Sequence, residues 1–363
     1  MVKLVCSDRL RTPIRGRTKP EPTPAAERQP KDDNMGIRIA GTGSYLPEKV
    51  LTNADIEKLV DTNDEWIRTR TGVEERRIAA PGETASTMAI AAAEKALATA
   101  GVDGRDIDAI VLATISPDYI FPNTAALIQH HFQCRQAFCF DLSAACAGFV
   151  SSLEVSFSLM RSFPKKYRNV LVCGSDKLSV LVDWTDRNTC ILFGDGAGCA
   201  LLQNDGTDTP DSILASSLHA DGGYTDVLRI PAGGSHMPAS IESVQAHKHF
   251  IYMEGRETFK LAVNGMVSSS EEVLAMAGVT IDQVSLVIPH QANRRIIQAV
   301  AKRLGVSEDR AFCNIQHYGN TSSASIGIAL DEACRAGRIK RGDLVLFTSF
   351  GGGLAWGSML LRF

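Results

Sequence analysis

The sequence predicts an α/β protein made of two similar halves. From residue 36 onward, short apolar strand candidates alternate with helical stretches, and the same order returns after about residue 250. Each series ends with a helix, a strand, a glycine-rich turn and a further strand, the turns being GDGAG (194–198) and GGG (351–353). The alternation predicts stacked layers with parallel strand pairing, and the repeated order predicts two related halves, 35–206 and 207–363.

The first half supplies six strand candidates, which are short, apolar and bounded by polar residues or glycine. They are IRIAGTG (37–43), DAIVLATI (108–115), AFCFDL (137–142), NVLVCGS (169–175), TCILF (189–193) and GCALLQ (198–203). Apolar residues at helical spacings predict helices over 84–101 and 148–160.

The second half repeats this scheme with longer helices. We predict helices over 255–278, 292–305 and 323–337, and strands over 284–289, 344–350 and 354–363. GDGAG and GGG each lie between two predicted strands, so we interpret both as tight turns and reject a phosphate-binding loop, which requires a helix after its glycines.

Residues 1–34 differ from the rest in composition. They hold five of the fourteen prolines and many charges, so we expect a flexible N-terminal extension. There is no secretory apolar region, and the acidic residues argue against an organelle transit peptide despite the arginine content. A translation start upstream of Met35 is the alternative explanation.

Composition narrows the class of protein. The 363 residues are 44% hydrophobic and 22% charged with net charge −3, which gives no sign of a nucleic-acid or anionic-membrane partner. No apolar run approaches the roughly 20 residues that span a bilayer. Nine scattered cysteines without a CxxC motif predict reduced thiols in a reducing, cytoplasmic setting, with neither a metal site nor disulfides.

Cys146 is the first candidate site residue. It lies in DLSAACAGFV (141–150), among small residues, where a predicted strand gives way to a predicted helix. Most free cysteines in such places are small buried hydrophobes. The other interpretation is a nucleophile whose thiolate is stabilised by the helix N-terminus. The local sequence alone favours the first.

Two polar loops supply the other candidates. His290 follows an apolar strand in VIPHQANRR (288–295), at the edge where an α/β sheet binds ligands. Asn320 lies in HYGNTSSAS (317–325), where it could also cap the next helix, as could Ser322 or Ser323. A Cys, a His and an Asn can supply a nucleophile, a proton carrier and a neutral donor. Papain-like hydrolases share this order, but the neighbourhood of their cysteine is missing here.

Several motifs together resemble β-ketoacyl-acyl carrier protein (ACP) synthase III. DLSAACAGF, IPHQAN, HYGNTS and FGGGLAWGS occur in the family's order, and the resemblance runs from about Gly36 to Phe363. It implies a thiolase-like fold with two βαβαβαββ halves in a five-layer αβαβα sandwich, and a homodimer. Elongating condensing enzymes are less similar because they carry a second His where this chain has Asn320.

The resemblance also implies a reaction. Cys146 would attack acetyl-CoA, with the Cys146 and Gly352 N–H groups holding the oxyanion. Malonyl-ACP would then lose CO2, and His290 and Asn320 would stabilise the resulting enolate. Attack on acetyl-Cys146 would give acetoacetyl-ACP and initiate type II fatty acid synthesis, with no metal or redox cofactor. The alternatives are a relative using another acyl primer in secondary metabolism, and a catalytically silent scaffold. The primer's length and branching are not predicted.

Further positions match the family's binding residues. Trp66 and Arg187 would sandwich the CoA adenine, Gly255 and Asn293 would line the pantetheine tunnel, and Phe121 would enter the partner subunit's acyl pocket. Arg256 stands at the tunnel mouth, where some relatives have Asn. The ACP would dock on the basic helix over 292–305 and the loop before it, at Gln291, Ala292, Asn293, Arg294 and Arg295.

Overall fold

The computed structural model describes residues 36–207 and 210–363. The predicted extension over residues 1–34 lies outside the described residues. The predicted division after residue 206 falls between a strand that ends at Asn204 and one that begins at Ile213, and it stays a prediction.

The first half forms a five-stranded mixed sheet. Its order is β1-β7-β6-β4-β5, with β6, β4 and β5 parallel and β7 antiparallel to both β6 and β1. The strands are β1 (Ile37–Tyr45), β4 (Ala109–Ala113), β5 (Phe138–Leu142), β6 (Asn169–Asp176) and β7 (Gly196–Asn204). The expectation of parallel pairing was therefore right for β6, β4 and β5 and wrong for the β1 and β7 side of the sheet.

The second half repeats that arrangement. Its order β8-β13-β12-β11 has the same sequence of antiparallel and parallel pairs, and a single parallel bridge between Val287 and Ala311 occupies the fifth position. The strands are β8 (Ile213–Ala220), β11 (Leu286–Pro289), β12 (Leu344–Gly351) and β13 (Ala355–Arg362). The two halves thus share a topology, as the repeated order predicted.

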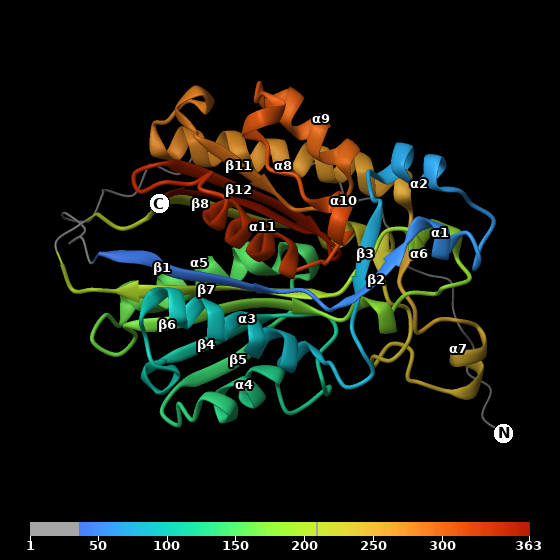
Figure 1. The fold of residues 1–363 in the computed structure, drawn as a ribbon, viewed down its shortest axis with the longest axis horizontal. Coiled ribbons are helices and arrows are strands. Elements are labelled where there is room, and N and C mark those ends of the chain that lie inside the picture. The colour runs from blue at the N-terminus through green and yellow to red at the C-terminus, as the bar shows by residue number, and fades with distance from the viewer. Residues whose placement is uncertain (1–35, 208–209) are drawn as a thin grey trace, which may run out of the picture. The chain divides into compact units, whose positions relative to one another are not determined.

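Helices and sheets alternate in five layers (Figure 1). α3 and α4 cover the outer face of the first sheet, α5 and α11 lie between the two sheets, and α8 and α9 cover the second sheet. The helices are α3 (Ala85–Ala100), α4 (Thr124–Phe132), α5 (Gly148–Ser162), α8 (Gly255–Ala277), α9 (Arg294–Leu304) and α11 (Ala324–Arg335). Among the described residues no helix is long and apolar enough to cross a bilayer.

Close packing between layers depends on small residues. A Cβ atom on Gly41 of β1 would lie 2.1 Å from the Ala96 carbonyl oxygen of α3. Similarly, a Cβ on Gly198 of β7 would lie 2.4 Å from the backbone of Gly327 in α11. These glycines let helix and sheet backbones touch, which a side chain would prevent.

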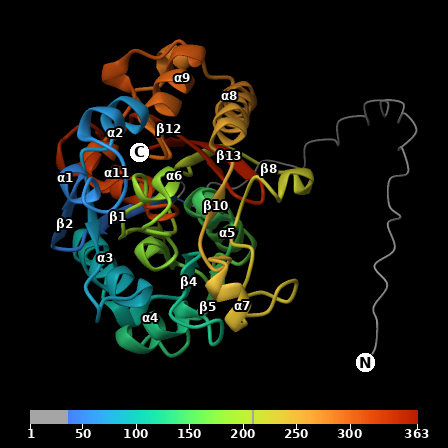
Figure 2. The same cartoon turned by 90° about the vertical axis from the view of Figure 1, so that its right-hand side faces the viewer.

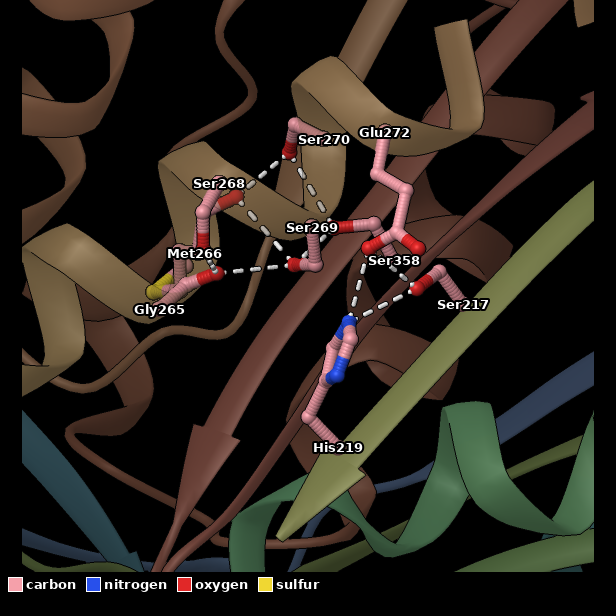
Figure 3. A network of polar contacts seen from close by, with 9 residues as sticks. All are labelled: Ser217, His219, Gly265, Met266, Ser268, Ser269, Ser270, Glu272 and Ser358. Atoms are coloured by element: carbon pink, nitrogen blue, oxygen red, sulfur yellow. Dashed lines mark hydrogen bonds and ion pairs between the residues drawn. The ribbon is translucent and has the colours of Figure 1, made fainter. Parts of the chain in front are cut away.

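α8 meets the second sheet through hydroxyl groups as well as apolar side chains (Figure 3). Ser269 and Ser270 contact Ser358 of β13 at 2.8 and 3.1 Å. At the edge of the sheet, Glu272 accepts a 2.8 Å bond from Ser217 and lies 2.8 Å from His219 Nε2. These contacts fix the register of α8, whose first turn lines the pocket described below.

Shorter elements gather where the central strands end. Figure 2 shows α2, α6 and β10 on the side that faces right in Figure 1. The elements are α1 (Asn53–Ile56), α2 (Asp64–Thr71), α6 (Arg187–Cys190), α7 (Ile241–Gln245), α10 (Ile315–Tyr318), β2 (Lys49–Thr52), β3 (Glu75–Ile78), β9 (Leu228–Arg229) and β10 (Tyr252–Met253).

Two local predictions were wrong. TCILF (189–193) is the end of α6 and an irregular segment, because its apolar residues pack beneath the pocket and make no strand ladder. GDGAG is not a turn: Gly196 and Gly198 lie within β7, where the missing side chains admit α11. The GGG turn was predicted correctly, since Gly351 and Ala355 are paired residues of β12 and β13.

Candidate active site

A pocket of about 1030 Å³ lies at the carboxyl ends of the central strands. Cys146, His290 and Asn320 all line it, although they are far apart in the sequence. Cys146 follows β5, His290 follows β11, and Asn320 lies between α10 and α11. The sequence pattern had placed each on its own loop, and the fold brings the three loops together.

Cys146 lies in a 3-10 turn (Ala145–Ala147) that leads directly into α5. The turn is sharp, with Ala145 at a φ of 45°, in the left-handed region. Gly351 packs against it so closely that a Cβ atom there would lie 2.6 Å from the Cys146 nitrogen. The GGG turn is therefore in close contact with the backbone of Cys146. Gly352 of this turn lines the same pocket.

The thiol of Cys146 is buried, with 8% of the residue exposed. Burial raises its pKa to about 12, against the opposing effect of hydrogen bonds with Ser322 and Asn320. The Sγ atom lies 3.5 Å from Ser322 Oγ. One of the two interpretations from the sequence was that the start of a helix favours a thiolate; the helix is present, but desolvation dominates and favours the neutral thiol.

The surroundings of His290 orient its ring and determine which ring nitrogen carries the hydrogen. Its Nδ1 atom lies 2.6 Å from Ser325 Oγ, which itself accepts a 3.3 Å bond from the Gln291 amide. Among the described residues Nδ1 is the one acceptor within hydrogen-bond distance of the Ser325 hydroxyl, so we assign the hydroxyl hydrogen to this contact and the ring hydrogen to Nε2. Burial lowers the pKa of His290 to about 3, so the ring is neutral at physiological pH. In this form its Nε2 is a hydrogen-bond donor.

The side chain of Asn320 can also donate a hydrogen bond into the pocket. Its Oδ1 accepts a 2.8 Å bond from the Ser322 amide, which leaves the Nδ2 group to donate. The Asn320 backbone bonds with Leu192 and Gly194, and this fixes the loop on the segment after α6. The alternative role of capping α11 is excluded, because Ser323 is the N-cap residue of that helix.

Of the two residues predicted to sandwich the adenine, Trp66 lines the pocket, and Arg187 lies over its ring without being one of the lining residues. The Arg187 guanidinium carbon is 4.1 Å from the centroid of the Trp66 ring. A third ring inserted between them would need about twice a van der Waals contact distance, so the pair would have to separate to bind one. Gly255 and Asn293 both line the pocket, and Asn293 Oδ1 also accepts the Arg295 amide at the start of α9. Arg256 lines the pocket as well.

The structure corrects one docking residue. Gln291 is 1% exposed, and its side-chain amide bonds with Pro289, Phe312 and Asn314. Its side chain braces the loop and is not available to a docking protein. Of the other predicted docking residues, Arg294 and Arg295 are exposed, while Ala292 is half-buried and lines the pocket.

Phe121 is not among the residues that line this pocket. It is 85% exposed, beside Ile120 at 91%. Two neighbouring apolar side chains in contact with water are unusual on a monomer surface. The prediction that Phe121 serves a partner subunit's pocket remains a prediction.

Comparison with known proteins gives a consistent result. Residues 140–222 match the family described as 3-oxoacyl-[acyl-carrier-protein (ACP)] synthase III, and residues 274–363 match its C-terminal part. The β-ketoacyl-[acyl-carrier-protein] synthase III of Caldanaerobacter subterraneus subsp. tengcongensis is 49% identical over 91% of this chain and 98% of its own length.

Solved structures agree with the sequence comparison. The 3-oxoacyl-[acyl-carrier-protein] synthase III of Aquifex aeolicus is 48% identical, with a TM-score of 0.83 over 90% of this chain and 100% of its own. The chain belongs to the β-ketoacyl-ACP synthase III family. A priming β-ketosynthase from the R1128 polyketide biosynthetic pathway is 35% identical, with a TM-score of 0.83 over 92% of this chain and 98% of its own.

The predicted family, thiolase-like fold and class of enzyme, an acyl-transferring condensing enzyme, are thus confirmed. The family assignment does not by itself fix the roles of single residues in this synthase.

Sequence reasoning missed several residues in and beside the pocket. Ser322 and Ser325 contact Cys146 and His290, yet each is one serine in a run and carries no signal of its own. Leu228, Met253 and Phe259 form part of the apolar wall. Leu228 and Met253 belong to the two-residue strands β9 and β10, and Phe259 lies near the start of α8. Their places at the pocket depend on tertiary packing, so no local pattern identifies them.

Proposed function

We propose that this synthase condenses acetyl-CoA with malonyl-ACP to give acetoacetyl-ACP, CoA and CO2, and so initiates type II fatty acid synthesis. The observation that carries the proposal is the convergence of one thiol and two neutral donors, Cys146, His290 and Asn320, in one pocket. A hydrolase would need a base for Cys146 or for water. His290 Nε2 carries the ring hydrogen and therefore serves as a donor.

The first half-reaction is transfer of the acetyl group to Cys146. The sulfur attacks the thioester carbonyl, the C–S bond to CoA breaks, and the thiol proton leaves with CoA as its thiol. Backbone N–H groups of Cys146 and Gly352 would hold the oxyanion. Because burial raises the pKa of the Cys146 thiol, we propose that the sulfur gives up its proton as it attacks the thioester and not before.

The second half-reaction begins with malonyl-ACP. Loss of CO2 leaves an enolate on the thioester, and His290 Nε2–H and Asn320 Nδ2–H would donate to its oxygen. The enolate carbon attacks acetyl-Cys146, the C–S bond breaks, and the Cys146 sulfur recovers a proton. The residues supply the required donors without a metal or redox cofactor, and we propose that none takes part.

We further propose a homodimer in which Phe121 enters the partner's pocket. The exposure of Phe121 and Ile120 supports a protein contact at this loop. Sedimentation of the wild type and of Phe121→Asp tests the assembly. A monomeric wild type would refute it.

The decisive experiment compares acyl primers. Acetyl-, isobutyryl- and octanoyl-CoA are each offered with malonyl-ACP, and kcat/KM is measured. We expect acetyl-CoA to be preferred. A clear preference for a longer primer would favour the second candidate function, a priming enzyme of secondary metabolism. The similarity to a priming β-ketosynthase of a polyketide pathway supports this second candidate.

A further inference from the structure

Arg76 is a buried cation in β3, with 0% of the residue exposed. Its two terminal nitrogens make three hydrogen bonds. Nη1 donates to the Leu51 carbonyl oxygen at 3.2 Å and to Asn53 Oδ1 at 3.0 Å, and Nη2 donates to the Ile191 carbonyl oxygen at 2.7 Å. Nε has no hydrogen-bond partner among the described residues. The guanidinium group is thus held at its end by neutral acceptors.

The positive charge of Arg76 has no carboxylate in direct contact. In the part of the chain that the structure describes, the acidic side chain whose charge acts on Arg76 is Glu75, and the ion pairs of Glu75 are with Arg77 at 3.8 Å and His317 at 4.0 Å. Burial lowers the pKa of Arg76 to about 10, which leaves the group charged at neutral pH. A buried cation without an ion-pair partner is costly, and its charge-assisted bonds to the three oxygens offset this cost.

Two of the three acceptors belong to a frame built from β2, β3 and α2. Leu51 is the residue of β2 that pairs directly with Arg76. Asn53 is 2% exposed, and its Nδ2 group donates to the Val73 carbonyl oxygen at 2.9 Å and to Asp64 Oδ1 at 2.8 Å, at the start of α2. Both donor hydrogens of Asn53 are therefore used, and its Oδ1 atom faces Arg76 as an acceptor.

The third acceptor, the Ile191 carbonyl, belongs to the segment that holds Asn320. The Asn320 amide donates to the Leu192 carbonyl oxygen at 2.8 Å, and the Gly194 amide donates to the Asn320 carbonyl oxygen at 3.0 Å. These bonds form a parallel bridge between Asn320 and Phe193. Ile191, Leu192 and Phe193 also line the pocket. The position of Asn320 in the pocket therefore depends on where this segment lies.

The stem of Arg76 lies close to both partners of that bridge. A Cβ atom on Gly194 would lie 3.1 Å from the Arg76 Cβ atom, and a Cβ atom on Gly319 would lie 3.4 Å from it. Gly319 is the residue before Asn320, and β3 lies beside α10, which leads into it (Figure 1). The side chain of Arg76 thus passes between β2 and the two loops that meet at Asn320.

We infer that Arg76 is a positioning residue for Asn320: its guanidinium group joins the Ile191 carbonyl to the frame of Leu51 and Asn53, and so fixes the segment to which the Asn320 backbone is bonded. Arg76 is not among the residues that line the pocket, so it acts through Asn320. The inference deepens the proposed function, because the part of Asn320 in decarboxylation rests on that proposal.

The position of Asn320 can be followed without any assay of condensation. Selective 15N labelling of asparagine gives a backbone amide signal for each Asn, and Asn320→Ala identifies the signal of Asn320. We expect this signal to move in Arg76→Lys, which keeps the charge but lacks the planar fork, and to move further in Arg76→Met, which lacks both. A signal that stays in place in Arg76→Lys would overturn the inference, whether or not Arg76→Met folds.

The two half-reactions test whether the displacement matters for the chemistry. We expect Arg76→Lys to lower kcat for malonyl-ACP decarboxylation about tenfold, with little change in KM or in acetylation of Cys146, because a displaced donor stabilises the enolate less. In Arg76→Lys combined with Asn320→Ala, the rate should equal that of Asn320→Ala within about twofold, because no side-chain amide is left to displace. A further tenfold loss in the double variant, or equal losses in both half-reactions, would overturn the inference.

Arg77→Lys is the matched control. Arg77 is the next residue of β3, so its side chain leaves the opposite face of the strand, and its Nη1 donates to the Pro47 carbonyl oxygen at 3.5 Å. We expect the Asn320 signal and the decarboxylation rate to stay as in the wild type, and changes as large as those in Arg76→Lys would overturn the inference. A moved Asn320 signal with an unchanged decarboxylation rate in Arg76→Lys would support the positioning by Arg76 and reject the role of Asn320 in the proposed function.

Discussion

The Nδ1 atom of His290 lies 2.6 Å from the Oγ atom of Ser325, and this contact determines which nitrogen faces the substrate. Because Nδ1 is the one acceptor within reach of the Ser325 hydroxyl among the described residues, Ser325 donates to it and leaves the ring hydrogen on Nε2. The neutral ring can then donate to an enolate oxygen. It cannot take the Cys146 proton at Nε2 in this form.

Ser325→Ala should impair decarboxylation more than acetylation. Without the Ser325 donor both ring forms become populated, and we expect a loss of about tenfold or more in malonyl-ACP decarboxylation, from the cost of an unsatisfied buried nitrogen. The 15N chemical shifts of the His290 ring should show the redistribution. Ser156→Ala is the control, because Ser156 Oγ is buried and has no hydrogen-bond partner among the described residues. Equal loss in both half-reactions would count against this role.

Cys146→Ala should abolish acetylation while keeping the fold, because it removes one sulfur from a site flanked by Ala145 and Ala147. Labelled acetyl-CoA followed by peptide mapping checks this. Label on Cys146 in the wild type and none in the variant is the expected result. Acetyl on another cysteine, such as the half-buried Cys313, would reject the nucleophile assignment.

His290→Ala and Asn320→Ala should separate the two half-reactions. Both residues are assigned to the enolate, so acetylation of Cys146 should persist while decarboxylation slows by on the order of 2–4 kcal/mol of barrier. Single-turnover assays of each step supply the measurement. If His290→Ala blocks acetylation and spares decarboxylation, His290 is the base for Cys146 and the assignment fails.

Burial of His290 should make stability depend on pH. Its pKa is lowered from 6.5 to about 3, so the folded state resists a proton that the unfolded chain accepts. The stability contribution is complete above pH 6.5 and declines as pH falls toward 3. Between pH 8 and pH 5 the free energy of unfolding should fall by about 2 kcal/mol more in the wild type than in His290→Gln. Parallel pH curves for the two proteins would refute this.

The sequence predicted the long elements well because their periodicity reflects burial. α3, α8 and α11 lie within one or two residues of the predicted helices. TCILF failed because an apolar run can pack against a pocket without pairing as a strand. Cys146, His290 and Asn320 were candidates from their local sequence, and the motif resemblance gave them roles. Ser325 was not found and Ser322 was named only as a possible helix cap, because their contacts with His290 and Cys146 join segments far apart in the sequence.

The last prediction concerns carrier-protein docking on α9. Arg295 is exposed at the start of this helix, lines the pocket and lies with its guanidinium 5.6 Å from the Phe259 ring centroid. Lys302 and Arg303 are exposed further along α9, while Ile296, Ile297 and Val300 are buried beneath. A basic face next to the pocket entrance suits an acidic protein partner despite the net charge of −3.

Arg295→Glu should therefore raise KM for malonyl-ACP and weaken its dependence on salt, since exposed charges act mainly on encounter and are screened beyond about 8 Å at physiological ionic strength. Acetyl transfer from acetyl-CoA should change little. Lys340→Glu is the matched control, because Lys340 is exposed just before β12, at the opposite end of that strand from the Gly351–Gly353 turn. If Arg295→Glu weakens both substrates equally, the charge acts on the shared pocket and α9 is not a specific docking site.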